Sequence, residues 1–237
     1  MSNILPIKTV ILKTFKLVFK KEYLYKFVII GAIFSLITFL LNLVINYFVN
    51  LSINQFPPFL IIIALLLSAF LYLYSFSFMI SFIYNFCLDV SVESVQNTNN
   101  YLMKAYQTSF QVLGSILTFG FIIFGGIILL LIPSIIWGVK YFFTSIISAL
   151  EGKKPKEALK ESKLLVKGYF WQILLRLIIF YLISSFPGLI ISSINSNFSF
   201  IQTFFIPITS LFYVILYNNL KYINQNSQQL LQNVQRI

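Results

Sequence analysis

The sequence predicts an all-α protein, a polytopic bundle of about six transmembrane helices. Hydrophobic residues make up 59% of its 237 residues and charged residues only 10%, and the mean hydropathy is +0.89. A soluble domain carries about 25% charged residues and could not bury so much apolar surface. Lipid can cover that surface instead, so the composition indicates one integral membrane domain over residues 1–237.

A second observation sets the number of spans: the linkers between apolar runs alternate between uncharged and charged. The uncharged linkers are residues 50–57, 132–134 and 192–199, and the charged segments are 1–26, 88–107, 151–168 and the polar tail 221–237. Lys and Arg near span ends stay in the cytoplasm. The alternation therefore predicts six spans with the N- and C-termini both cytoplasmic.

The six predicted spans lie within residues 27–220, at 27–48, 58–87, 110–131, 134–150, 169–191 and 200–220. Each approaches or exceeds the roughly 20 residues that cross a hydrocarbon core. An alternative joins 134–150 to the preceding run as a re-entrant hairpin, which would turn the Lys-rich linker outward, so we reject it. Gly125-Gly126 and residues 184–188 mark hinges or close helix packing, and packing is favoured.

The basic N-terminal segment, residues 4–19, is too short and too charged to span the membrane. On a helix, one face carries Ile7, Ile11, Phe15 and Val18, and the other carries Lys8, Lys13, Lys16 and Lys20. This amphipathic pattern predicts an interfacial helix on the cytoplasmic leaflet.

The linker 151–168 predicts a second, short amphipathic helix between spans four and five. Gly152 fits the end of one helix and Pro155 the first turn of the next. Gly168 then ends this helix before an aromatic run. The apolar stripe consists of Ala158, Leu159, Ser162, Leu165 and Val166. We expect the helix to lie along the cytoplasmic face.

Two stretches carry a family resemblance. Ala158, Leu159, Ser162 and Gly168 form one pattern, and Pro207-Ile208 followed by Leu216-Tyr217-Asn218-Asn219-Leu220-Lys221 forms the other. They resemble the six-span prokaryotic membrane proteins that are similar to the membrane domain of glycerophosphoryl diester phosphodiesterase, although Asn218 stands where that family usually has an acid. The resemblance implies six spans and the cell membrane of a prokaryote. It does not imply phosphodiesterase chemistry, because the catalytic barrel is a separate domain.

Two basic residues, Lys140 and Arg176, lie inside predicted spans, where ionisable groups are costly and suggest function. Arg176 lies seven residues past Tyr169, so snorkelling to the interface is favoured over a site. For Lys140, near mid-membrane, two interpretations are equally supported. The ammonium binds an anionic group, or it has only a structural role and bonds exposed carbonyls or snorkels. If Lys140 lines a polar cavity, the expected lining residues are Tyr72, Ser75, Tyr181 and Tyr213.

The chain has no His, one Cys and six acidic residues, and none of the acids lies in a predicted span. Enzymes and metal sites depend on such groups, so we expect no catalytic residue, metal or cofactor. An ion-coupled carrier is also disfavoured, because no acidic residue lies in a predicted span to bind the coupling ion. The net charge of +11 lies mainly beside the spans, as membrane topology requires, and does not indicate nucleic-acid binding.

We therefore expect a non-enzymatic integral membrane protein that serves as a scaffold or accessory in membrane and lipid homeostasis. The alternative is a transporter or flippase of a small anionic or amphipathic substrate, centred on Lys140. A third reading is a subunit of an enzyme whose active site lies in another chain. The expected partners are membrane lipids, including anionic headgroups at the cytoplasmic face, and a protein partner or a second copy of the chain.

Overall fold

The computed structural model describes residues 4–55, 58–129, 131–194 and 205–234, and in these ranges it contains helices and no strand. The helices are α1 (Ile7–Val18), α2 (Lys21–Gln55), α3 (Pro58–Val92), α4 (Thr98–Leu129), α5 (Leu131–Tyr141), α6 (Thr144–Glu151), α7 (Pro155–Val166), α8 (Phe170–Ile194) and α10 (Ile206–Val234). The all-α prediction is confirmed for the described residues.

Within the described residues, four stretches are long and apolar enough to cross a membrane, judged by length and composition. They are Lys21–Val44, Ile62–Val92, Thr98–Ile128 and Ile132–Glu151. Counting the pair of α7 and α8, which meet at a bend of 101°, as one further span raises the number to five. The chain is thus a helical protein with four or five candidate membrane spans.

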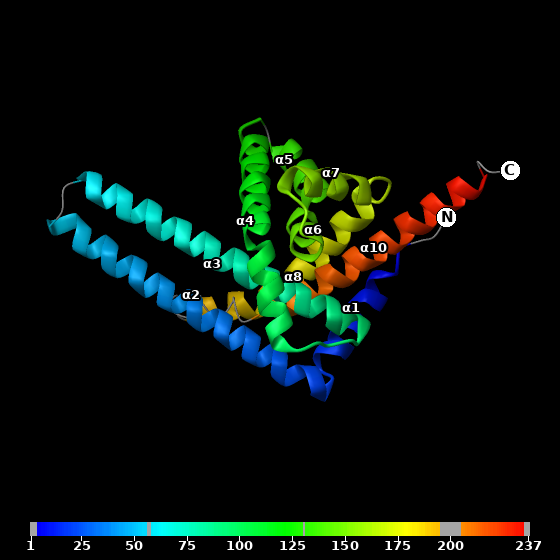
Figure 1. Cartoon of the computed structure of the whole chain (residues 1–237), viewed down its shortest axis with the longest axis horizontal. Helices are drawn as coiled ribbons and strands as arrows, with labels where there is room; N and C mark the ends of the chain where they lie inside the picture. The colour runs from blue at the N-terminus through cyan, green and yellow to red at the C-terminus, as the bar shows by residue number, and fades with distance from the viewer. Residues whose placement is uncertain (1–3, 56–57, 130, 195–204, 235–237) are drawn as a thin grey trace.

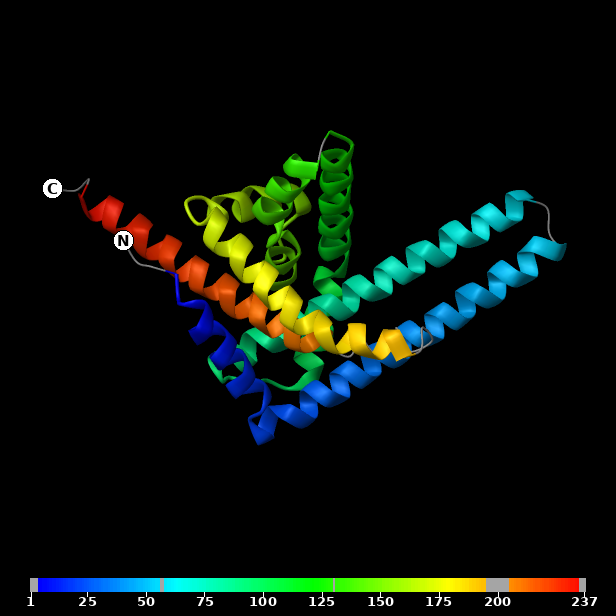
Figure 2. The same ribbon diagram turned by 180° about the vertical axis from the view of Figure 1, so that it is seen from behind.

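Helices α2 and α3 form a long hairpin that projects from the rest of the molecule, and they lie side by side in both views (Figures 1 and 2). Each has 35 residues, or about 52 Å of helix, which exceeds a hydrocarbon core of about 30 Å. Near its base the hairpin is joined by edge-on aromatic pairs, Phe27 with Phe86 at 5.3 Å and Phe34 with Phe76 at 5.9 Å between ring centroids.

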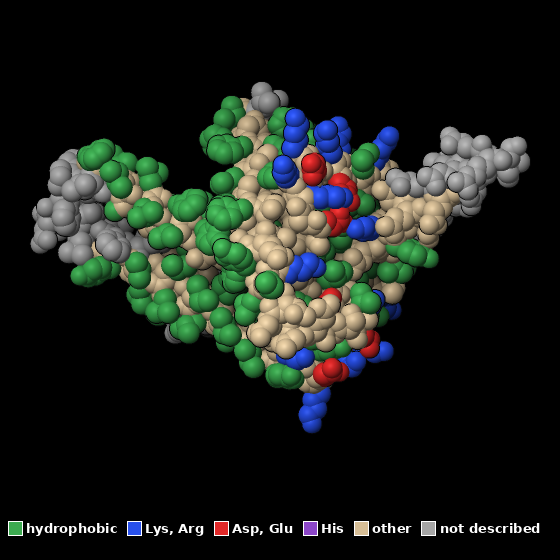
Figure 3. Space-filling view, viewed as in Figure 1, with side chains coloured by type: hydrophobic (Ala, Val, Ile, Leu, Met, Phe, Trp, Pro, Cys, Tyr) green, Lys and Arg blue, Asp and Glu red, His purple; other side chains and the backbone are tan. Residues whose placement is uncertain are grey.

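The surface separates apolar from charged side chains. Hydrophobic groups cover the projecting hairpin and the flank of α4, and charged groups gather over α7 and the α1–α2 and α3–α4 connections (Figure 3). On the hairpin, large side chains such as Leu36 and Leu66 are exposed. A soluble protein rarely leaves so continuous an apolar surface exposed, whereas lipid would cover it.

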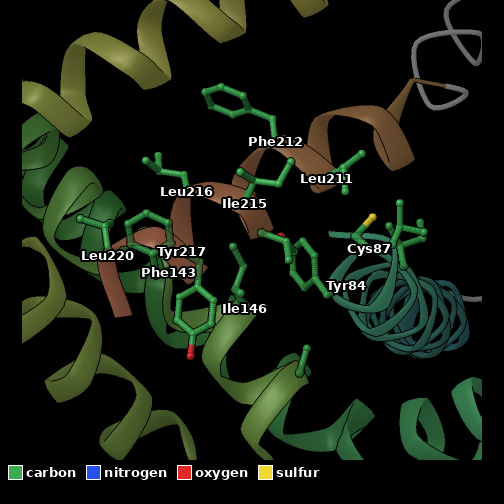
Figure 4. Close-up of a cluster of buried hydrophobic side chains, with 14 of the residues drawn as sticks. Tyr84, Cys87, Phe143, Ile146, Leu211, Phe212, Ile215, Leu216, Tyr217 and Leu220 are labelled. Atoms are coloured by element: carbon green, nitrogen blue, oxygen red, sulfur yellow. The ribbon is translucent and has the colours of Figure 1, made fainter. Parts of the chain in front are cut away.

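The core lies where α10 meets α3 and α6 (Figure 4). Leu216 and Tyr217 of α10 are buried beside Phe143, and Cys87 of α3 is buried with its thiol 3.5 Å from the carbonyl oxygen of Pro207. On the other side, the ring of Phe212 in α10 stacks on that of Phe180 in α8, with centroids 3.7 Å apart. The last helix of the chain therefore supplies the centre of the fold. 

Buried polar groups join α3, α4 and α6. The hydroxyls of Ser81 and Thr108 are 2.6 Å apart, and those of Ser115 and Ser148 are 2.5 Å apart. The Asn85 amide donates to the carbonyl oxygen of Ala149 at 3.1 Å. Small side chains and hydrogen bonds of this kind are typical of helix contacts in membranes.

Two glycines of α4 allow close helix contact. A Cβ at Gly126 would lie 2.8 Å from the Cα of Ser134, and one at Gly114 would lie 2.7 Å from Cγ of Pro155. At Gly120 and Gly125 a Cβ would meet nothing within 4 Å. Of the predicted pair Gly125-Gly126, close packing therefore applies to Gly126, and Gly114 makes a further close contact that the sequence did not single out.

Helix α1 differs in detail from its prediction. Its buried residues are Val10, Thr14, Leu17 and Val18, whereas Ile7, Ile11 and Phe15 are only partly buried. The face is rotated because α1 packs against α10 and α2, so contact with protein determines which side chains are covered. Its position on the cytoplasmic leaflet stays a prediction.

Candidate functional site

An open cleft of about 760 Å³ lies between α2, α3 and the start of α4. Its walls are mainly apolar, formed by Ile29, Ile30, Ile33 and Ile37 of α2 and by Phe78, Met79, Phe82 and Phe86 of α3. Ile30, Ile33 and Ile37 are spaced three and four residues apart, and Ile29 lies four residues before Ile33, so they share one side of α2. The volume falls within the range of about 300–1,000 Å³ that is usual for ligand sites.

The cleft runs along the hairpin. Tyr25 and Ile37, its outermost residues on α2, are about 18 Å apart along the helix axis, and Tyr74 and Phe86 are separated by the same distance on α3. One leaflet of a bilayer has a hydrocarbon depth of about 15 Å, half of the core. The cleft is therefore as long as one leaflet is deep.

One end of the cleft is lined by Tyr25 and Lys26 of α2, by Gln96 of the α3–α4 connection and by Thr98, the first residue of α4. Tyr74 and Ser75 of α3 line the other end. The ammonium of Lys26 lies 5.8 Å from the centroid of the Tyr25 ring. Among the described residues, the ion pairs do not include Lys26. A cation without a carboxylate partner thus stands at the mouth of an apolar cleft.

The wall at this mouth is held in place by Tyr101 of α4. Its hydroxyl donates to Asp89 Oδ2 at 2.8 Å and accepts from the backbone N–H of Gln96 at 2.7 Å. Its ring contacts those of Phe82 and Phe86 edge-on, at 6.0 and 5.9 Å. Tyr101 therefore ties the α3–α4 connection to α3 and fixes the shape of the mouth.

The residues expected around Lys140 lie in different places. Ser75 lines the cleft, and Tyr72 and Ser75 border a second cavity of only about 10 Å³. Tyr181 is 64% exposed on α8, and the Tyr213 ring packs against Phe142 at 4.8 Å, close to Lys140 in the chain. Lys140 is partly buried and lines neither cavity.

Arg176 is turned into the protein, with only 8% of its surface exposed, and its snorkelling to the membrane interface stays a prediction. Its guanidinium donates to the carbonyl oxygen of Gln172 at 2.8 Å and to that of Leu5 at 2.7 Å. The N–H of Leu5 in turn donates to Asn219 Oδ1 at 3.1 Å. Arg176 and Asn219 thus hold the segment before α1 between α8 and α10.

The span predicted at 134–150 is broken, since α5 ends at Tyr141 and α6 begins at Thr144. Ser162 of α7 bridges the break: its hydroxyl donates to the carbonyl oxygen of Lys140 at 2.9 Å and accepts from the N–H of Phe143 at 3.2 Å. A side chain from another helix thus satisfies backbone groups that the break leaves without helical partners.

Helix α7 turns its small and apolar side chains inward. Ala158, Ser162, Leu165 and Val166 are buried and Leu159 is half-buried. Gly152 before the helix has a φ of +66° and Gly168 after it a φ of +87°, a region that favours glycine. Pro155 occupies the first turn, as the sequence indicates.

An ion cluster joins α6, α7 and α10. Glu151 lies 2.6 Å from the ammonium of Lys153 and also binds the ammonium of Lys221 and the hydroxyl of Tyr217. Lys153 binds Glu161 as well. The hydrogen bonds to Glu151 and Glu161 raise the pKa of Lys153. The acidic and basic groups of this cluster pair with one another, so the cluster stabilises the packing of three helices.

The comparisons with known proteins give no relative: no family model matches the sequence, no curated protein matches it, and no solved structure matches the fold. In the described part of the chain, no group of three or more His, Cys, Asp or Glu side chains could hold a metal ion. The described residues therefore define a helical protein with four or five candidate membrane spans, and the cleft between α2, α3 and α4 is its candidate site.

Sequence reasoning did not find this cleft. It counted Lys26 among the basic residues of the N-terminus and gave the isoleucines of the first span no role. One signal was available, since Ile30, Ile33 and Ile37 follow Lys26 at helical spacing on one face of α2. The spacing alone could not show that α3 and α4 leave this face uncovered.

Proposed function

We propose that this chain is a six-span, non-enzymatic protein of a prokaryotic cell membrane, with both termini cytoplasmic, which binds membrane lipid as a scaffold or accessory in lipid homeostasis. In this proposal the spans are α2, α3, α4, the α5–α6 pair, α8 and α10. The alternation of charged and uncharged linkers supports the number of spans. The exposed apolar surface of the hairpin supports its contact with lipid.

The observation that carries lipid binding is the cleft. Isoleucine and phenylalanine side chains line it, it opens within a helix pair that is a candidate for membrane insertion, and its length matches the hydrocarbon depth of one leaflet. A hydrocarbon chain fits such walls, because it needs shape and apolar contact and makes no demand for hydrogen bonds. The ligand class favoured is therefore a lipid and not a small polar metabolite.

The test compares two tryptophan substitutions on α2. Ile33→Trp places a larger ring in the cleft, whereas Leu36→Trp places the same ring on an exposed position of the same helix that does not line the cleft. Native mass spectrometry of the protein purified in mild detergent should show bound phospholipid on the wild type and on Leu36→Trp, and a loss on Ile33→Trp.

Equal lipid retention by all three proteins would contradict binding in this cleft. A wild-type protein that carries no lipid under these conditions, or after reconstitution with added phospholipid, would contradict the proposed function itself. Circular dichroism and gel filtration of both variants establish that each is folded, so that loss of lipid is separated from loss of structure.

A further inference from the structure

We infer that the cleft selects phospholipids with an anionic headgroup, which Lys26 binds at the mouth while one acyl chain lies between α2 and α3. This inference rests on the proposed function, since it names the lipid class that the same cleft takes. Beyond binding lipid, the polar end of the cleft distinguishes anionic headgroups from those without net charge, and Lys26 is the residue responsible.

The first argument compares the ion pairing of two lysines of this region, Lys20 and Lys26. Lys20 is paired with Glu93 at 3.1 Å and lies 3.9 Å from Glu22, so its charge is largely compensated. Lys26 lines the cleft and is absent from the ion pairs of the described residues. An anionic headgroup would give this ammonium the partner that the protein does not supply.

The second argument concerns the groups that accompany Lys26. Thr98, the first residue of α4, lines the mouth, so the positive end of the dipole of a 32-residue helix is directed there. The phenol of Tyr25 adds a hydroxyl donor beside the ammonium. The acidic residue closest in this network, Asp89, does not line the cleft and is engaged by the hydroxyl of Tyr101. The mouth thus presents an ammonium, a phenol and a helix N-terminus to a ligand.

The third argument is the depth in the membrane at which the polar end of the cleft and its apolar walls lie. The polar groups stand at the end of the cleft that adjoins the charged α1–α2 and α3–α4 connections, and the apolar walls extend from there for about 18 Å. A lipid seated in this way has its headgroup at the membrane surface and its chain along one leaflet. By the charge of these connections, the leaflet is the cytoplasmic one, where anionic lipids face the protein's basic segments.

The experiment measures headgroup preference separately from lipid binding. The full-length protein is reconstituted with equal amounts of phosphatidylglycerol and phosphatidylcholine that carry the same acyl chains, and the lipids retained by the protein are identified by native mass spectrometry. The wild type should retain phosphatidylglycerol preferentially. Lys26→Gln should lower the ratio of phosphatidylglycerol to phosphatidylcholine about fivefold, the effect of one lysine near a membrane surface, while total bound lipid is unchanged.

Two further variants make the result specific. Lys21→Gln removes a charge from an exposed position of α2 that does not line the cleft, and it should leave the ratio unchanged. Lys26→Arg keeps the charge and should keep the preference. An identical ratio in the wild type and in Lys26→Gln would overturn headgroup selection by Lys26 and leave lipid binding standing. A wild type that retains no lipid would overturn both proposals.

Discussion

Removing the hydroxyl of Ser162 should destabilise the protein, because this single side chain satisfies two backbone groups at the break between α5 and α6. In Ser162→Ala the N–H of Phe143 loses its acceptor and the carbonyl of Lys140 loses its donor. Both Ser162 and Phe143 are fully buried, so water does not replace the lost bonds. A buried group left without a partner costs about 1–3 kcal/mol, and we expect a loss of about 2 kcal/mol in the free energy of unfolding.

A matched control removes a hydroxyl that bonds only within its own helix. The Ser68 hydroxyl donates to the carbonyl oxygen of Leu65 at 2.9 Å on the exposed part of α3, and Ser68→Ala should change stability by less than about 0.5 kcal/mol. Reversible unfolding in mixed micelles, followed by the fluorescence of Trp137 in α5, measures both variants. Equal stability of Ser162→Ala and Ser68→Ala would refute the role assigned to the bridge.

Two more predictions concern helix packing and topology. Gly126→Ala should destabilise the α4–α5 contact by about 1–3 kcal/mol relative to Gly125→Ala in the same unfolding assay, because only the former places a Cβ 2.8 Å from the Cα of Ser134; equal stabilities would contradict the contact. For topology, an impermeant maleimide added outside intact cells should label Ser52→Cys and not Lys156→Cys, since residues 50–57 are uncharged and residues 151–168 are basic. Labelling of Lys156→Cys alone would reverse the proposed orientation.

The helices of this protein could be predicted from composition and linkers because their signals are local. Apolar runs of sufficient length separated by polar linkers indicate helices in a membrane protein. The turn before α7 was also readable, since Gly152 adopts the left-handed conformation and Pro155 begins the helix. These features depend on neighbouring residues and not on the tertiary arrangement.

The parts that sequence reasoning missed depend on residues far apart in the chain. The break at Phe142–Phe143 contains neither Pro nor Gly, and its partner Ser162 lies on another helix. Arg176 donates to the carbonyl oxygen of Leu5, which lies 171 residues earlier in the chain. The cleft likewise depends on how α2, α3 and α4 are arranged, which no local pattern specifies.

The position of α10 at the centre of the fold has a consequence for biogenesis. A membrane protein is synthesised from its N-terminus, so α10 leaves the ribosome after helices α1 to α8. Until then, Ser91 of α3 lacks the amide of Asn218, and Leu5 lacks the side chain of Asn219. Contacts so distant in sequence form late. Insertion of the early helices therefore precedes assembly of the core, and the nascent chain must shelter the inner face of α3 until α10 has been made.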